Sequence, residues 1–178
     1  MFNGFSYWQY NFYMPILAPN HLEFLSRSPE QTRRIGMRLG GLLNPGDLIC
    51  LSGDLGAGKT TFVQGMAQGW GSLDRVTSPT FVLVNVYRRP TMESLYHLDA
   101  YRLENAMEAE DLDLDIMLEN GPLVVEWSER IEKALPSGHL LIQLRWVAEE
   151  HRNMILSPTG DRYENLVIEL RRRAFGGG

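Results

Sequence analysis

Residues 53–60 of the chain read Gly53-Asp54-Leu55-Gly56-Ala57-Gly58-Lys59-Thr60. This stretch fits the pattern Gly-x4-Gly-Lys-Thr, which is typical of loops that bind the phosphate groups of a nucleotide. The sequence predicts a short apolar strand just before the loop, over residues 48–52, and a helix just after it, from about residue 58 to residue 70. Because a phosphate-binding loop needs both flanks, its setting supports the interpretation.

The residue types in the loop suit phosphate chemistry. Glycine tolerates backbone angles that turn successive N–H groups into one concavity, and the N-terminus of the following helix adds positive potential there. The Lys59 ammonium can reach the β- and γ-phosphates, and the Thr60 hydroxyl can bind Mg²⁺. The residues expected to hold the nucleotide are Gly53, Gly56, Ala57, Gly58, Lys59, Thr60 and Thr61. A glycine-rich turn without a ligand is the alternative.

Such a loop also needs an acidic residue at the end of a neighbouring strand, to hold the metal or its water. Glu126 directly follows an apolar run over residues 123–125, which is typical of a strand buried on both faces. Asp99, at the end of a strand predicted over residues 94–99, is the second candidate. We therefore expect Lys59, Glu126 and Asp99 to be catalytic and Thr60 and Glu126 to bind the metal. The alternatives are a surface group at a strand end for Glu126 and a turn residue before Tyr101 for Asp99.

A hydroxyl-rich segment lies between the loop and these carboxylates. It contains Thr77, Ser78 and Thr80 around a proline. These three side chains are candidate switch-like residues that sense the γ-phosphate, and a plain turn fits the same spacing equally well.

The remaining chain reads as a succession of strands and helices. A short strand is expected over residues 22–25, and a helix is expected to begin at Ser28, a good N-cap. Residues 81–88 and 94–99 predict an antiparallel hairpin, and residues 104–118 predict a partly helical segment. Polar and apolar residues alternate over 140–147, which predicts an edge strand with one face in water. A closing helix is predicted from Tyr163, Leu166, Val167 and Leu170.

The chain divides into an N-terminal aromatic segment over residues 1–20, a single domain over 21–173 and a flexible tail over 174–178. Seven aromatic residues fall within residues 1–13, without any charge or helical period. This segment is a partner-binding arm, a loosely packed tail, or an extension upstream of a true start at Met14. The pattern leaves all three readings open.

The composition is that of an ordinary globular protein, with 178 residues of which 44% are hydrophobic and 22% charged. The net charge of -5 disfavours strong non-specific binding to nucleic acid, which needs a basic surface. Cys50 is the single cysteine and lies in an apolar run, so we expect a buried thiol. No apolar stretch approaches a membrane span and the N-terminus lacks the basic region of a signal peptide, so we expect a cytoplasmic protein.

Some classes of phosphate-loop protein are disfavoured. The sequence has no Asn-Lys-x-Asp stretch to read guanine and no Asp-x-x-Gly switch after the loop, which argues against a Ras-like GTPase. Nothing matches the signature of transporter ATPases. The arginines are scattered and do not gather in a lid, so a small kinase is an alternative without support.

Four separated motifs resemble those of one family. They are residues 53–62, residues 77–81, residues 96–103 (Tyr-His-Leu-Asp-Ala-Tyr-Arg-Leu) and the pair Glu126-Trp127. Their order and spacing are similar to those of the bacterial TsaE family, also called YjeE, the ATPase component of tRNA threonylcarbamoyladenosine biosynthesis. The resemblance covers roughly residues 22–147. It departs at Ser128, where the family usually has proline, and at Ala100, where a larger apolar residue is common.

The resemblance implies an α/β P-loop NTPase fold, in which a mixed sheet has a parallel centre, flanking antiparallel strands and helices on both faces. It implies that Gly56 to Thr61 wrap the phosphates of ATP and that Thr60 and Glu126 hold Mg²⁺. Asp99 and the 77–81 segment would be switch-like parts of the site. Trp127, next to Glu126, is expected to report nucleotide binding through its fluorescence.

The resemblance also implies partners, the TsaD and TsaB proteins, which transfer a threonylcarbamoyl group to adenosine 37 of tRNA. The ATPase would support that transfer, act weakly alone, and reach tRNA only through the complex, in agreement with the acidic net charge. The alternative is a stand-alone small-molecule phosphotransferase of the P-loop class. Comparing ATP turnover by the chain alone, with small acceptors and with TsaB–TsaD distinguishes the two.

Overall fold

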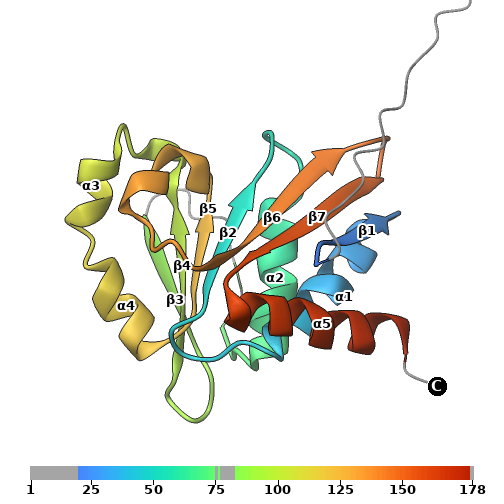
Figure 1. Ribbon diagram of the computed structural model, residues 1–178, viewed down its shortest axis with the longest axis horizontal. Helices are drawn as coiled ribbons and strands as arrows, with labels where there is room; N and C mark the ends of the chain where they lie inside the picture. The colour runs from blue at the N-terminus through green and yellow to red at the C-terminus, as the bar shows by residue number, and fades with distance from the viewer. Residues whose placement is uncertain (1–19, 75, 77–82, 177–178) are drawn as a thin grey trace, which may run out of the picture.

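A computed structural model describes residues 20–74, 76 and 83–176, and its centre is a seven-stranded sheet (Figure 1). The strands are β1 (Leu22–Ser26), β2 (Leu48–Ser52), β3 (Val84–Arg88), β4 (Ser94–Asp99), β5 (Leu123–Glu126), β6 (His139–Trp146) and β7 (Arg152–Thr159). Their order is β1-β7-β6-β2-β5-β4-β3. The neighbours β6, β2, β5 and β4 pair in parallel, and β7, β1 and β3 pair antiparallel. This confirms the predicted mixed sheet with a parallel centre.

Helices cover both faces of the sheet (Figure 1). The first face carries α1 (Pro29–Gly40), α2 (Lys59–Trp70) and α5 (Asp161–Phe175). The second face carries the short helices α3 (Ala106–Glu110) and α4 (Leu114–Asn120), with single 3-10 turns at residues 100–102, 128–130 and 132–134. Among the described helices, none is long and apolar enough to cross a membrane.

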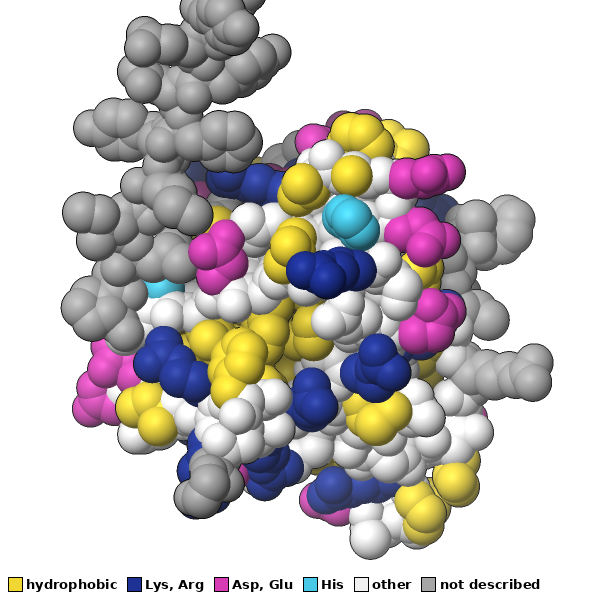
Figure 2. All heavy atoms as spheres, turned by 90° about the vertical axis from the view of Figure 1, so that its right-hand side faces the viewer, with side chains coloured by type: hydrophobic (Ala, Val, Ile, Leu, Met, Phe, Trp, Pro, Cys, Tyr) yellow, Lys and Arg dark blue, Asp and Glu magenta, His cyan; other side chains and the backbone are white. Residues whose placement is uncertain are grey.

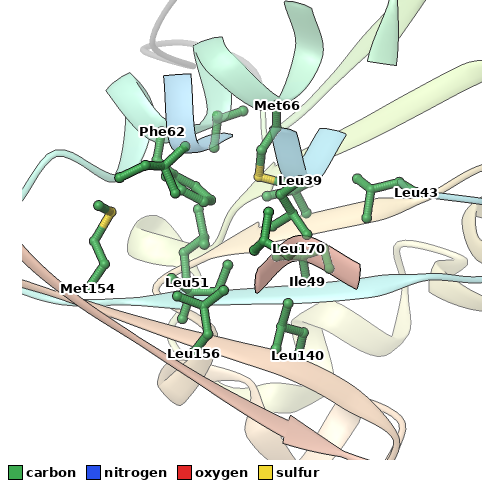
Figure 3. Packing of buried hydrophobic residues seen from close by; sticks show 14 of the residues in the cluster. Leu39, Leu43, Ile49, Leu51, Phe62, Met66, Leu140, Met154, Leu156 and Leu170 are labelled. Carbon is green, nitrogen blue, oxygen red and sulfur yellow. The ribbon is translucent and has the colours of Figure 1, made fainter. Parts of the chain in front are cut away.

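The larger apolar core lies under the first face. Figure 3 shows side chains of α2, α5 and the α1 region pointing toward those of β2, β6 and β7, among them Leu39, Leu43, Phe62, Met66, Leu170, Ile49, Leu51, Leu140, Met154 and Leu156. Burial of such side chains stabilises the fold by roughly 25 cal/mol for each Å² of apolar surface removed from water. Cys50 is buried on the second face, as expected.

The contact between α1 and α2 is built from glycines. A Cβ atom added at Gly40 would overlap the Met66 carbonyl, and one added at Gly69 would overlap the Met37 carbonyl. Gly36 and Gly65 meet the facing helix in the same way. The two backbones therefore approach more closely than side chains would allow, which fixes the position of α2 on the sheet.

Several local predictions are confirmed. The Ser28 hydroxyl accepts a hydrogen bond from the Gln31 N–H at 3.2 Å and caps α1. The predicted hairpin forms as β3 and β4. Tyr163, Leu166, Val167 and Leu170 are the buried residues of α5. Tyr163 also connects α5 to the sheet by a hydrogen bond, because its hydroxyl accepts from the Leu48 N–H of β2 at 2.8 Å.

The prediction of an edge strand over residues 140–147 is wrong. β6 lies inside the sheet between β2 and β7, with both of its edges paired. The polar residues of β6 have a different explanation. Gln143 lines a cavity on the second face of the sheet, which short helices leave partly uncovered. β7 itself was not predicted.

The arginines at the end of α5 have partners on the protein. Arg172 and Arg173 pair with Glu169, and Arg171 donates to the His21 carbonyl at 2.9 Å. Figure 2 looks onto the side at the right of Figure 1 and shows Lys and Arg side chains interspersed with Asp and Glu and with uncharged side chains on the described part of this surface. The aromatic segment over residues 1–13 lies outside the described residues.

Candidate functional site

The phosphate loop joins the end of β2 to the start of α2. Gly56 and Gly58 have φ angles of 79° and 99°, which residues with a side chain rarely adopt. The Ala57 N–H donates to the Asp54 carbonyl at 3.0 Å, and the Phe62 N–H donates to the Gly58 carbonyl at 2.9 Å, where the helix begins. The loop and the first turn of α2 thus border a cavity of about 280 Å³.

The lining of this cavity includes most of the predicted site. Gly56, Gly58, Lys59, Thr60, Thr61, Asp99, Glu126 and Trp127 line it together with Leu55 and Tyr101. Two predicted binding residues of the loop, Gly53 and Ala57, are not among the residues that line the cavity. Ala57 is buried in the core of the first face, and Gly53 lies so close to the Leu144 carbonyl that a Cβ atom would overlap it.

Lys59 is 5% exposed and is held by backbone oxygens. Its Nζ donates to the carbonyls of Gly53 and Asp54, the latter at 3.0 Å. The same atom lies 3.7 Å from the centroid of a Trp127 ring, a cation–π contact. Burial lowers the pKa of Lys59, and the carboxylate of Glu126, with other acidic groups, opposes that shift. The Lys59 ammonium group is therefore held at the loop by two backbone carbonyls and an aromatic ring.

The two predicted carboxylates are neighbours. β4 and β5 run parallel, and their register places Asp99 opposite Glu126 at the carboxyl ends of both strands. Glu126 is 3% exposed, and the Thr60 hydroxyl donates to its Oε1 at 3.1 Å. Asp99 accepts a hydrogen bond from the Tyr101 N–H at 3.0 Å. The structure thus brings Lys59, Thr60, Glu126 and Asp99 to one cavity.

Trp127 has an unusual backbone conformation for a residue with a large side chain, with φ of 58°. Its ring lies between Lys59 and Tyr101, whose ring centroid is 5.1 Å from that of Trp127. Such a conformation costs energy and is often found at functional sites. Thr77, Ser78 and Thr80, the switch-like candidates, lie outside the described residues.

Sequence reasoning missed two residues near the site. His97 lies in the motif over residues 96–103, and its Nε2 is 3.0 Å from Glu126 Oε1. Arg152, at the start of β7, donates to the Gly56 carbonyl at 3.3 Å. Arg152 also contacts the carbonyls of Ala148, Glu149 and His151. The spacing of His97 two residues before Asp99 signals a shared face of β4; nothing in the sequence signals Arg152.

Comparisons with known proteins agree with this geometry. The family model described as "Threonylcarbamoyl adenosine biosynthesis protein TsaE" matches residues 26–154. A Bacillus subtilis tRNA threonylcarbamoyladenosine biosynthesis protein TsaE is 40% identical over 152 residues, which are 85% of this chain and 94% of the relative. The Streptomyces coelicolor protein of the same name is 43% identical over 146 residues, with coverage of 78% and 97%.

A solved structure is also similar. The crystal structure of Bacillus subtilis YdiB superimposes with a TM-score of 0.72 at 35% sequence identity, covering 86% of this chain and 95% of that one. The range matched by the family model, residues 26–154, includes both carboxylate-bearing strands and the phosphate loop.

Proposed function

Because the chain belongs to the TsaE family, we propose that it is an ATP-binding, Mg²⁺-dependent ATPase that takes part in threonylcarbamoyladenosine formation on adenosine 37 of tRNA. It would act in the cytoplasm with the TsaB and TsaD proteins, and would meet tRNA through them. The observation that carries the proposal is a single cavity lined by Lys59 and Thr60 of the phosphate loop and by Asp99 and Glu126 of the adjacent strands.

The residues around the cavity suit magnesium. A threonine hydroxyl and two carboxylates are hard oxygen ligands of the kind that Mg²⁺ prefers. Within the described residues, no three His, Cys, Asp or Glu side chains gather as a metal site. Thr60 and Glu126 would therefore share the ion with the phosphates of the nucleotide, a common way to bind Mg²⁺. The ion would neutralise charge on the phosphoryl oxygens.

The protein groups have separable tasks in this proposal. Lys59 would exchange its two carbonyl partners for the β- and γ-phosphates, a stronger interaction between opposite charges. Glu126 would orient the Thr60 hydroxyl by accepting a hydrogen bond from it. Asp99 and the segment with Thr77, Ser78 and Thr80 would respond to the γ-phosphate. Movement of Lys59 away from the Trp127 ring would change the indole fluorescence, which supports Trp127 as the reporter.

We expect the hydrolysis rate to depend on partner proteins because the negative charge on the transferring phosphoryl group must be stabilised. Among the described residues, Arg152 contacts the loop, and four backbone carbonyls accept hydrogen bonds from its guanidinium. An arginine that stabilises the transferring phosphoryl group is worth roughly 10³–10⁵ in rate and can come from another protein. We therefore expect slow hydrolysis by the chain alone and faster hydrolysis with TsaB–TsaD.

Steady-state phosphate release tests the proposal. The isolated protein and its mixture with TsaB–TsaD are compared, with a Lys59→Ala variant as the control for contaminating ATPases. Release that is faster in the mixture and absent with Lys59→Ala supports the proposal. If the isolated protein hydrolyses ATP as fast as the mixture, partner dependence fails, and a stand-alone ATPase or small-molecule phosphotransferase becomes the better account.

A further inference from the structure

A chain of buried polar side chains crosses three strands and ends at the Thr60 hydroxyl. The Tyr87 hydroxyl on β3 lies 3.2 Å from Nδ1 of His97 on β4. The other ring nitrogen of His97, Nε2, lies 3.0 Å from Glu126 Oε1. Tyr87, His97 and Glu126 are 4%, 0% and 3% exposed. Polar groups this deeply buried are costly unless each one has a partner.

The hydrogen bonds of this chain converge on the Glu126 carboxylate. Burial raises the pKa of Tyr87 to about 12, so its hydroxyl keeps its proton and can donate to His97 Nδ1. The Glu126 carboxylate can only accept a hydrogen bond, so His97 Nε2 carries a proton and donates to it. The Thr60 hydroxyl donates to the same carboxylate oxygen at 3.1 Å. Glu126 thus receives donors from two sides, one from the sheet and one from the phosphate loop.

These contacts restrict the carboxylate. A glutamate side chain has three rotatable bonds, and ordering them costs conformational entropy. His97 sits on the neighbouring strand with its ring enclosed, so its position is set by the sheet and not by the site. A rigid donor of this kind holds Glu126 in the rotamer that reaches Thr60.

We infer that His97 is a positioning residue, which holds the Glu126 carboxylate against Thr60 in readiness for the Mg²⁺ that accompanies a nucleotide, and that Tyr87 orients His97. The inference rests on the proposed function and assigns no direct contact between His97 and nucleotide or metal. Partners of metal-binding groups commonly contribute 10- to 100-fold to metal affinity.

Two amide substitutions test the inference, because they differ by one methylene group. The side-chain nitrogen of His97→Gln can stand near the place of Nε2 and donate to Glu126. The nitrogen of His97→Asn stops near the place of Nδ1 and falls short of it. Calorimetry of ADP binding in EDTA and over a Mg²⁺ titration gives two readouts, the metal-free ADP affinity and the half-saturating Mg²⁺ concentration.

We expect His97→Asn to raise the half-saturating Mg²⁺ concentration by about 10- to 100-fold while metal-free ADP affinity changes little. His97→Gln should restore most of the loss. Tyr87→Phe should shift the Mg²⁺ dependence severalfold in the same direction, and it decides the matter if His97→Asn does not fold. Tyr163→Phe is the matched control, because it removes a buried tyrosine hydroxyl near the far end of β2.

The outcomes separate the inference from the proposed function. If the ADP affinity of the wild-type protein does not depend on Mg²⁺, both the inference and the proposed function are overturned. If the wild type depends on Mg²⁺ but the folded Asn and Gln variants show the same dependence as wild type, His97 has no positioning role. A parallel loss of metal-free and Mg²⁺-supported affinity in the variants would also overturn it, because that pattern belongs to general structural damage.

Discussion

The two faces of the sheet are covered in different ways. On the first face, α1 and α2 are twelve residues long each and meet through glycines with almost no space between their backbones. On the second face, α3 has five residues and α4 seven, and Met107 and Ile116 on them remain exposed. The phosphate loop is attached to the first, closely packed face. A helix that cannot slide keeps the loop in register with the carboxylates of β4 and β5.

The largest expected effect is on the first face. Lys59→Ala should weaken ATP·Mg binding by at least about 100-fold, because the buried cation that we propose to bind phosphate is lost. The sequence offers a matched control, since Lys133 is the only other lysine and is exposed on the second face. Calorimetry with both variants tests the assignment. Tight binding by folded Lys59→Ala, or equal losses for both variants, would contradict it.

Glu126→Gln should slow hydrolysis by about two orders of magnitude in the presence of TsaB–TsaD while nucleotide still binds, because the charge at the proposed metal site is lost and the shape is kept. Phosphate release measures the effect. Glu132→Gln, an exposed carboxylate on the second face, is the control and should leave the rate unchanged. Unchanged turnover in Glu126→Gln would move the metal role to Asp99.

Gly65→Ala should lower the free energy of unfolding by about 1–3 kcal/mol, because the new methyl group meets the Arg33 carbonyl and forces the helices apart. It should also weaken ATP·Mg binding severalfold, since the phosphate loop is displaced with α2. Leu114→Ala on α4 should cost about 2 kcal/mol or more of stability and leave binding unchanged. Denaturant titrations and calorimetry check both quantities. The comparison of faces breaks if the two variants affect nucleotide affinity equally.

The smallest expected signal comes from Cys50 on the second face. Burial raises the pKa of its thiol to about 12, against an ordinary value near 9. Only about one thiol in ten thousand is ionised at pH 8, so labelling of the native protein should be very slow there. The labelling rate should rise as pH approaches that pKa, and should become fast at pH 8 once denaturant exposes the thiol.

ATP·Mg should slow Cys50 labelling further if both faces unfold together, because a ligand stabilises the native state. Rapid labelling of native protein at pH 8, whether or not nucleotide is bound, would show that the second face opens on its own.

Much of this site could be predicted because its signals are local. The loop pattern and the acidic residues at strand ends are visible in short stretches of sequence. The family resemblance implied a mixed sheet with a parallel centre and flanking antiparallel strands. β7 was missed because its pattern is weak and contains Pro158, which lies past Leu156, the last residue of β7 that pairs with β1. The roles of His97 and Arg152 depend on contacts with residues 29 and 96 positions away.

The pairing of Asp99 with Glu126 also limits how such a chain can vary in length. Side chains alternate between the two faces of a strand, so one residue inserted within β5 before Glu126 would send its carboxylate to the opposite side of the sheet. The middle of the crossover between β4 and β5, over residues 104–120, has no strand alternation to preserve. Insertions and deletions that preserve activity should therefore accumulate in that crossover and spare the two strands, whatever else changes around them.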